Sequence, residues 1–159
     1  MITKALILAM ILMESGGNPI AQSHAGAEGL LQMTPIAVRE VQTQHSMPNP
    51  VNLFNPEENI TYGILLLEHY IEQCGSVKKA LICYNGGYAA LLRFRAGGID
   101  ALPEETQAYV PRVLGLMRDL DPMFQRELPY DRDPSYIESA VNTVFDNLYG
   151  TSSLFGAVL

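Results

Sequence analysis

Apolar residues recur along this chain at helical spacing, and Gly and Pro separate one apolar stretch from the next. Residues 2–14 are mostly Ala, Leu, Ile and Met, so the pattern predicts a helix that is buried on all sides. Gly16-Gly17 are expected to end this helix. No stretch alternates apolar and polar residues convincingly, as a half-exposed strand would. The pattern therefore predicts an all-α protein.

Residues that favour helix ends mark the later helices. Thr34-Pro35 opens a predicted helix that runs to about His45, and Asn55-Pro56 opens one that runs to Cys74. Further helices are predicted over residues 77–84 and 88–96, from Pro103 with a kink or break at Pro111, and from Asp133-Pro134 to Gly150.

The apolar run from Ala5 to Met13 has two interpretations. It fits the hydrophobic region of a secretory signal peptide, and it also fits the first helix of a folded domain that ends at Glu14. A signal peptide needs a cleavage site of small residues, whereas Glu-Ser-Gly-Gly follows Met13 here. We therefore interpret the run as a buried helix. This interpretation implies that the sequence carries no evident export signal.

Composition and charge narrow the classes of function. The 159 residues suit one domain with one core, and the longest apolar run is too short to span a membrane. The net charge of −7 argues against a nucleic-acid partner or an anionic lipid surface. The acidity is concentrated after residue 100, where nine Asp and Glu accompany four Lys and Arg.

Cys74 and Cys83 are too few for a disulfide framework. One disulfide is possible by count, but two buried thiols are the simpler interpretation. His24, His45 and His69 show no ligand spacing with these cysteines, so no metal site is expected.

Four stretches of the chain resemble the motifs of one enzyme family. In chain order they are Glu14-Ser15 with Asn18-Pro19; Ser23, Gly26-Ala27 and Gly29-Leu30-Leu31-Gln32; Tyr84-Asn85-Gly86-Gly87; and Leu102-Pro103, Glu105-Thr106 and Tyr109-Val110. A further landmark comprises Asn55-Pro56, Asn59-Ile60 and Gly63. Together, over roughly residues 2–118, these motifs resemble the soluble lytic transglycosylase domain, a member of the goose-type-lysozyme-like glycosidases that cleave peptidoglycan. The resemblance implies a lysozyme-like fold and a catalytic domain over residues 1–120. The acidic region that follows lies outside the resemblance, and we expect residues 121–159 to form a helical extension that packs on the domain or tethers it.

Glu14 is the residue whose position suits the acid of a glycosidase. Glycosidic cleavage needs a protonated acid, and the end of an apolar helix raises a carboxyl pKa by desolvation and through the helix dipole. The resemblance implies that Glu14 alone protonates the β-1,4 bond between N-acetylmuramic acid and N-acetylglucosamine. It then accepts the proton of the C6 hydroxyl, which leaves a 1,6-anhydro end without metal or cofactor. Glu28 is the candidate for a second carboxylate.

The resemblance also implies five residues that contact the substrate or orient Glu14: Ser23, Gln32, Tyr84, Asn85 and Tyr109. Gln32 and Asn85 would hydrogen-bond the glycan, although Asn85 also suits a helix end. Ser23 would hold the loop or the substrate beside the cleft, and Tyr109 would orient the Glu14 carboxyl. Tyr84 is expected either to line the cleft or to lie in the core. Three glycines are expected to serve backbone geometry: Gly26, Gly29 and Gly86.

Three functions are open on the sequence alone. The leading interpretation is a peptidoglycan lytic transglycosylase encoded by a phage or mobile element. The same fold would support a goose-type lysozyme that adds water. A third interpretation is a glycan-binding structural protein of a virion or secretion apparatus, with the acidic C-terminal part as its contact. Because no export signal is evident, delivery to the periplasm or cell wall by a phage particle, lysis system or secretion machine is expected.

Overall fold

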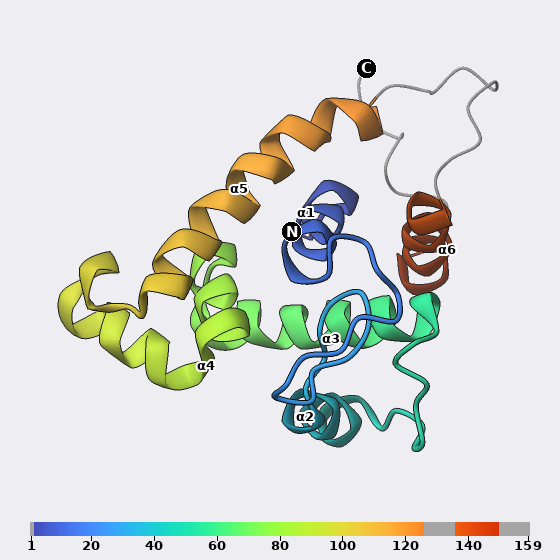
Figure 1. Ribbon diagram of the computed structural model, residues 1–159, viewed down its shortest axis with the longest axis horizontal. Helices are drawn as coiled ribbons and strands as arrows, with labels where there is room; N and C mark the ends of the chain where they lie inside the picture. Colours follow the sequence, from blue (N-terminus) through green and yellow to red (C-terminus); the bar gives the residue numbers. More distant parts are fainter. Residues whose placement is uncertain (1, 126–135, 150–159) are drawn as a thin grey trace.

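The computed structural model describes residues 2–125 and 136–149, which form α-helices, one 3-10 turn and no β-strand beyond two isolated bridge pairs (Figure 1). The elements are α1 (Lys4–Glu14), α2 (Pro35–His45), α3 (Pro56–Cys74), α4 (Val77–Gly97), the 3-10 turn η1 (Ile99–Ala101), α5 (Glu104–Gln125) and α6 (Tyr136–Tyr149). The predicted all-α class is confirmed.

The helices begin where side chains satisfy their free backbone N–H groups. Thr34, Asn55 and Ser76 each accept a hydrogen bond from a backbone N–H in the first turn of α2, α3 and α4. Gly75 ends α3 with a φ of +80°, a left-handed conformation that favours glycine. The helix boundaries predicted at these positions are confirmed.

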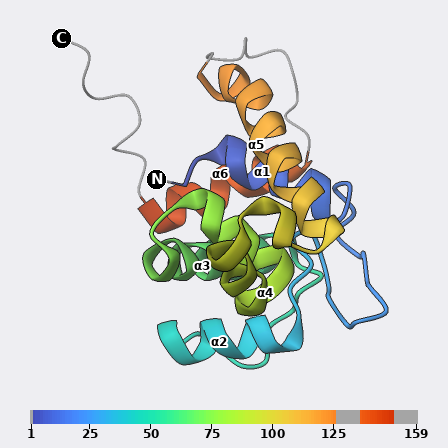
Figure 2. The ribbon, with the colours of Figure 1, turned by 90° about the vertical axis from the view of Figure 1, so that its left-hand side faces the viewer.

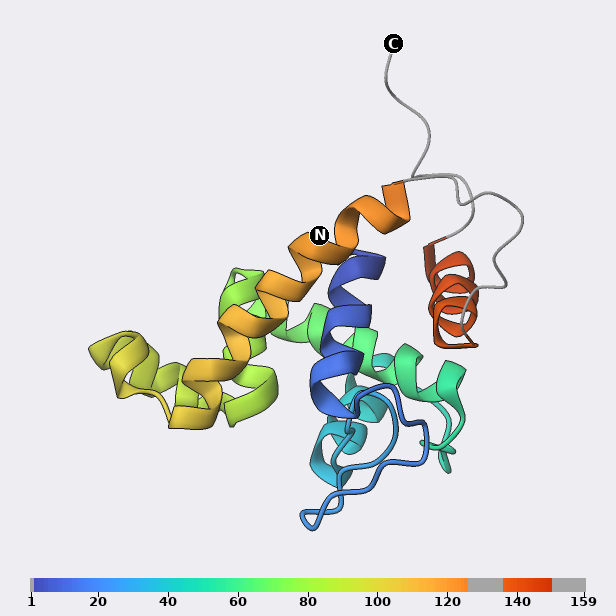
Figure 3. The ribbon, with the colours of Figure 1, turned by 45° about the horizontal axis from the view of Figure 1, so that its top comes forward.

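α1 lies between α5 and α6 and packs against both (Figures 1 and 3). Its residues from Ala5 to Ile11 are all buried, and five of them belong to the main hydrophobic core: Leu6, Ile7, Ala9, Met10 and Ile11. The Thr3 side chain caps the helix by accepting a hydrogen bond from the Leu6 N–H at 3.1 Å. The apolar run near the start of the sequence is therefore a core helix, as predicted, and Glu14 is its last residue.

α3 separates the two apolar clusters of the domain. It lies between α2 on one side and α1 on the other (Figures 1 and 2). A second, smaller cluster fills the space between α2 and α3; its buried members are Met33, Val41, Leu53, Tyr62 and Leu66. The loop of residues 15–33 leaves α1, and its later part is fixed against α3 by hydrogen bonds that Glu28 and Leu31 make with Asn59.

α5 runs unbroken from Glu104 to Gln125, although Pro111 and Pro122 lie within it. Of the kink or break predicted at Pro111, the break is wrong, and a kink stays a prediction. Proline removes one backbone hydrogen bond, the one that the Gln107 carbonyl would accept. Pro111 is exposed, so water can satisfy that carbonyl while the other face of the helix keeps its core contacts.

α6 packs on α3 and α1. Four of its residues belong to the main core: Ala140, Val141, Val144 and Phe145. The predicted helix start at Asp133-Pro134 and its stop at Gly150 lie outside the described residues. The division at residues 120 and 121 stays a prediction, and α5 passes this point as one helix. None of the described helices combines the length and apolar character needed to cross a membrane.

Candidate active site

The Glu14 carboxyl lies at the end of α1, partly exposed as a side chain but with its Oε1 atom buried. Burial is the largest cause that raises the pKa of Glu14, from an ordinary 4.5 to about 7. The negative charge of Glu105 raises it further, whereas the nearby Tyr109 hydroxyl lowers it by stabilising the carboxylate. A substantial fraction of Glu14 is therefore a neutral acid at neutral pH.

Three buried polar side-chain atoms have no hydrogen-bond partner in the part of the chain that the structure describes: Glu14 Oε1, Asn85 Oδ1 and Tyr109 Oη. Buried polar atoms are nearly always paired, so an unpaired group needs an explanation. All three belong to residues that the sequence predicts for the site. The Tyr109 hydroxyl is close enough to lower the pKa of Glu14 without completing a hydrogen bond of normal geometry. Each of the three atoms therefore has hydrogen-bonding capacity that the described residues leave unused.

A kink in α4 brings Asn85 next to α5. At Gly87 the backbone has a φ of +69° and a ψ of 178°, a conformation nearly restricted to glycine. A Cβ on Gly86 would lie 2.8 Å from Thr106 Oγ1, so glycine there permits the close approach of α4 and α5. The Asn85 Nδ2 donates to Glu105 Oε1 at 3.3 Å. The third and fourth sequence motifs thus meet in space, next to the end of α1.

Tyr84 and Tyr109 both face the charge of Glu14. Burial raises the pKa of each tyrosine well above its usual range, and the negative charge of Glu14 adds to the effect. The Tyr84 hydroxyl donates to the Leu31 carbonyl at 2.8 Å and ties α4 to the loop that follows α1. Tyr84 therefore acts as a tether between segments, and its contact with a substrate stays a prediction.

Ser23 and Gln32 hold the loop of residues 15–33 in shape. The Ser23 Oγ accepts a hydrogen bond from the Ala27 N–H at 3.0 Å. The Gln32 Nε2 donates to two carbonyls of the same loop, at 3.2 and 2.9 Å. The bond to Ser23 fits a loop-holding role for this residue, and its place beside a cleft stays a prediction. A substrate contact through Ser23 or Gln32 stays a prediction.

Glu28 has the contacts of a loop residue. Its Oε1 accepts a hydrogen bond from Gln22 Nε2 at 3.0 Å, and its backbone carbonyl accepts one from Asn59 Nδ2 at 2.9 Å. The Glu14 Oε1, in contrast, is buried without a partner. The environment therefore favours Glu14 over Glu28 as the acid.

Asn59 on α3 fixes the loop of residues 15–33 by hydrogen bonds. This side chain is fully buried, and its Oδ1 accepts from the Leu31 N–H at 2.8 Å. Its Nδ2 donates to the carbonyls of Glu28 and Leu53, both at 2.9 Å. Gly29 has a φ of +77° and lies so close that a Cβ would overlap the Asn59 amide. The glycine and the asparagine together define one position for the loop.

Three comparisons with known proteins bear on this geometry. A family model described as the transglycosylase SLT domain matches residues 1–97. The chain belongs to this family. The transglycosylase of Enterobacteria phage PRD1 is 33% identical over 82 residues, which cover 52% of this chain and 28% of that protein. The soluble lytic murein transglycosylase of Salmonella typhimurium is 32% identical over 127 residues, which cover 71% of this chain and 20% of that protein.

The fold of this SLT domain is also that of a solved relative. The crystal structure of the 70 kDa soluble lytic transglycosylase from Escherichia coli matches with a TM-score of 0.71 at 25% identity. The match covers 78% of this chain and 22% of that one. The lysozyme-like fold and the family predicted from the motifs are confirmed. The chain spans between a fifth and just over a quarter of the length of these relatives.

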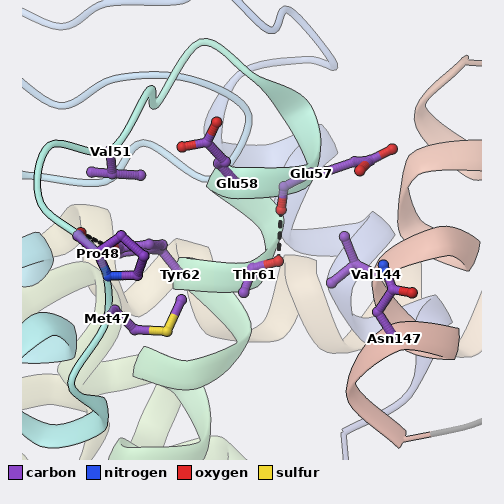
Figure 4. A pocket seen from close by; sticks show the side chains of 9 residues that line it. All are labelled: Met47, Pro48, Val51, Glu57, Glu58, Thr61, Tyr62, Val144 and Asn147. Atoms are coloured by element: carbon purple, nitrogen blue, oxygen red, sulfur yellow. Dashed lines mark hydrogen bonds between the residues drawn. The ribbon is translucent and has the colours of Figure 1, made fainter.

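A cavity of about 290 Å³ lies elsewhere in the chain, between the loop before α3, the first turns of α3 and the end of α6 (Figure 4). Its lining includes Tyr62, Glu58 and Asn147. None of its nine lining residues is a predicted site residue, so it is separate from the group around Glu14. In the described residues, no cluster of His, Cys, Asp or Glu is arranged to hold a metal ion.

Two residues of the chain have roles that the motifs did not reveal. Glu105 was part of a motif without an assigned role. Its position beside Asn85 follows from the meeting of α4 and α5, and its influence on Glu14 follows from the packing of α5 on α1. Asn59 was a landmark on a helix, and its three hydrogen bonds reach segments 6, 28 and 31 residues away in the sequence. An asparagine within an apolar helix stripe is a signal of such a buried role.

Proposed function

We propose that this chain is a peptidoglycan lytic transglycosylase that cleaves the β-1,4 bond between N-acetylmuramic acid and N-acetylglucosamine. Membership of the SLT family supports the reaction class. The observation that carries the proposal is the group of three buried, unpartnered polar atoms on Glu14, Asn85 and Tyr109. One acid with a raised pKa, next to two unsatisfied polar groups, suits the protonation of a sugar–sugar oxygen.

Glu14 is the proposed sole acid and base. Its carboxyl proton passes to the glycosidic oxygen as the bond between that oxygen and the anomeric carbon breaks. The resulting carboxylate accepts the proton of the C6 hydroxyl, and the C6 oxygen bonds to the same anomeric carbon. Glu14 is protonated again at the end, no water is consumed, and the product carries a 1,6-anhydro ring.

The other site residues have proposed positioning roles. The Tyr109 hydroxyl stays protonated and stabilises the carboxylate that forms after the first proton transfer. The Asn85 amide is held through its Nδ2 by Glu105, which leaves the Oδ1 to accept a hydrogen bond from the glycan. Ser23 and Gln32 hold the shape of the loop of residues 15–33, and we propose that this loop borders the substrate next to Glu14.

The proposed substrate lies in the periplasm or cell wall, which the chain would reach through a phage particle, a lysis system or a secretion machine. The phage PRD1 relative, named a transglycosylase, supports a phage connection. We propose residues 121–159 as the acidic extension that contacts such a partner and residues 1–120 as the catalytic domain.

Product analysis tests the proposed reaction. Purified peptidoglycan digested with the wild-type chain is expected to release muropeptides with 1,6-anhydro ends, which lack one water relative to reducing ends. Mass spectrometry distinguishes the two products. Reducing ends would identify a hydrolase of goose-lysozyme type, and glycan binding without any cleavage would identify a structural binding protein; either result contradicts the proposal.

Glu105→Gln is expected to lower the pKa of Glu14, because the negative charge of Glu105 favours the protonated acid. In the wild type, kcat/KM on glycan strands should fall as the pH rises through about 7, the pKa of Glu14. In the Glu105 variant this fall should begin at a lower pH.

Tyr109→Phe should move the fall in kcat/KM to a higher pH, because the Tyr109 hydroxyl that is lost stabilises the Glu14 carboxylate.

The matched control is Glu104→Gln, which removes the same charge from the exposed neighbouring position in the first turn of α5. Its pH–rate profile should coincide with that of the wild type. Equal shifts in the Glu104 and Glu105 variants would show a general effect of net charge and contradict the specific role of Glu105.

A further inference from the structure

The two cysteines form a close pair outside the candidate active site. Cys74 is the last residue of α3, and Cys83 lies in the first half of α4, nine positions later. Their Sγ atoms are 3.0 Å apart, and both side chains are buried in the main core as free thiols. Gly75 and Ser76 form the tight turn between the helices. The fold therefore holds two sulfur atoms in direct contact across the turn between α3 and α4.

We propose that Cys74 and Cys83 are an oxidation site that forms an intramolecular disulfide. A disulfide bond is about 2.05 Å long, so the two Sγ atoms need to approach by roughly 1 Å. Such a displacement is within reach of small side-chain rotations. The bond would join the end of α3 to α4 directly before Tyr84, whose hydroxyl ties α4 to the loop beside Glu14. The cross-link would thus restrain the segment that carries Tyr84 and Asn85.

The oxidant that we propose is a disulfide, either a small molecule or a protein with an oxidised cysteine pair. A thiolate of one cysteine attacks the oxidant and releases one reduced thiol. The other cysteine then attacks the mixed disulfide, forms the Cys74–Cys83 bond and releases the second reduced thiol. The chain loses two hydrogen atoms, and the two electrons reduce the oxidant to two thiols.

The environment of the pair sets the expected rate. Burial is the largest cause that raises the pKa of Cys83, to about 12, with further contributions from the Cys74 thiol. Thiolates are therefore rare in the folded chain. Oxidation is expected to be slow unless the turn between α3 and α4 unfolds locally and exposes the thiols. The same burial would protect the finished disulfide from reductants. Disulfides persist outside the cytoplasm, where the proposed function would bring the chain.

Mass spectrometry of the full chain tests this site. In the first arm, reduced, folded protein is incubated with oxidised glutathione. In the second arm, the protein is unfolded and then refolded in the same redox buffer. The products of both arms are then unfolded and alkylated. We expect a monomer that has lost two hydrogen atoms, has no alkylatable thiol and yields a peptide that links Cys74 to Cys83. Its Tm should exceed that of the reduced chain by roughly 5–10 °C, and dithiothreitol should reverse the shift.

Cys74→Ala and Cys83→Ala are the matched controls, since each keeps one thiol and should show no change in Tm with oxidant. Two alkylatable thiols in both arms, glutathione on both cysteines, or a disulfide-linked dimer would overturn the proposal. The mass readout requires no glycan cleavage. A failure here is therefore distinct from a failure of the proposed function, which the muropeptide products decide.

Discussion

Glu14→Gln is expected to reduce kcat/KM on peptidoglycan by about 10²- to 10⁴-fold, the usual contribution of a general acid and base. Glutamine has nearly the same shape as glutamic acid but can neither donate the proton to the glycosidic oxygen nor accept one from the C6 hydroxyl. The partly exposed position at the end of α1 should tolerate the amide, so the variant should fold and keep its far-UV circular dichroism spectrum. Release of muropeptides per unit time measures the loss.

Glu28→Gln is the informative partner of this variant, because Glu28 is the alternative carboxylate. Its Oε1 accepts a hydrogen bond from Gln22 within the loop, a contact unrelated to proton transfer. We expect a change in kcat/KM of less than about tenfold. An equal loss in both variants would favour a two-carboxylate hydrolase. Full activity in Glu14→Gln would remove Glu14 from the mechanism.

Asn59→Ala is expected to destabilise the fold by about 3–5 kcal/mol, a large fraction of the stability of a domain of this size. The variant loses three hydrogen bonds, two of them buried, and leaves the Leu31 N–H without its acceptor. The Leu53 carbonyl loses the Asn59 donor, and the Glu28 carbonyl keeps only the Met33 N–H. Urea unfolding at equilibrium measures the change, and the midpoint should fall with little change in the m-value.

Asn18→Ala is the control for this variant. The Asn18 Oδ1 accepts one hydrogen bond from the Ile20 N–H on the exposed part of the loop, so its loss should cost less than about 1 kcal/mol. Because Asn59 fixes the loop beside Glu14, the Asn59 variant should also lose activity at temperatures where it is still folded. Equal unfolding midpoints for the two variants would contradict the role of Asn59.

The sequence predicted the helices well because their ends depend on local chemistry. Thr34, Asn55 and Ser76 are side chains that satisfy a backbone N–H within their own helix, so their effect does not depend on the rest of the fold. The break predicted at Pro111 failed because solvent exposure, which decides whether a lost hydrogen bond matters, depends on tertiary packing. The pattern of α1 correctly predicted a buried helix, since its apolar residues cover every face.

The sequence singled out most residues of the candidate site, but it predicted fewer of the contacts that these residues make. The position of Glu14 at the end of an apolar helix predicted a raised pKa, and burial is its main cause in the fold. The contribution of Glu105 to the pKa of Glu14 was missed, because it arises from the packing of α5 on α1, which is a tertiary contact. The hydrogen bonds from Gln32 Nε2 to two loop carbonyls were missed as well, and the contact of Gln32 with a substrate stays a prediction.

The central claim is that Glu14 is present in large part as a neutral carboxylic acid at neutral pH, held so by burial at the end of α1. Its pKa can be measured directly by ¹³C NMR of the labelled side-chain carboxyl, with the Glu14→Gln spectrum assigning the signal. The account predicts a titration midpoint at about 7. A midpoint near the ordinary value of 4.5 would contradict it.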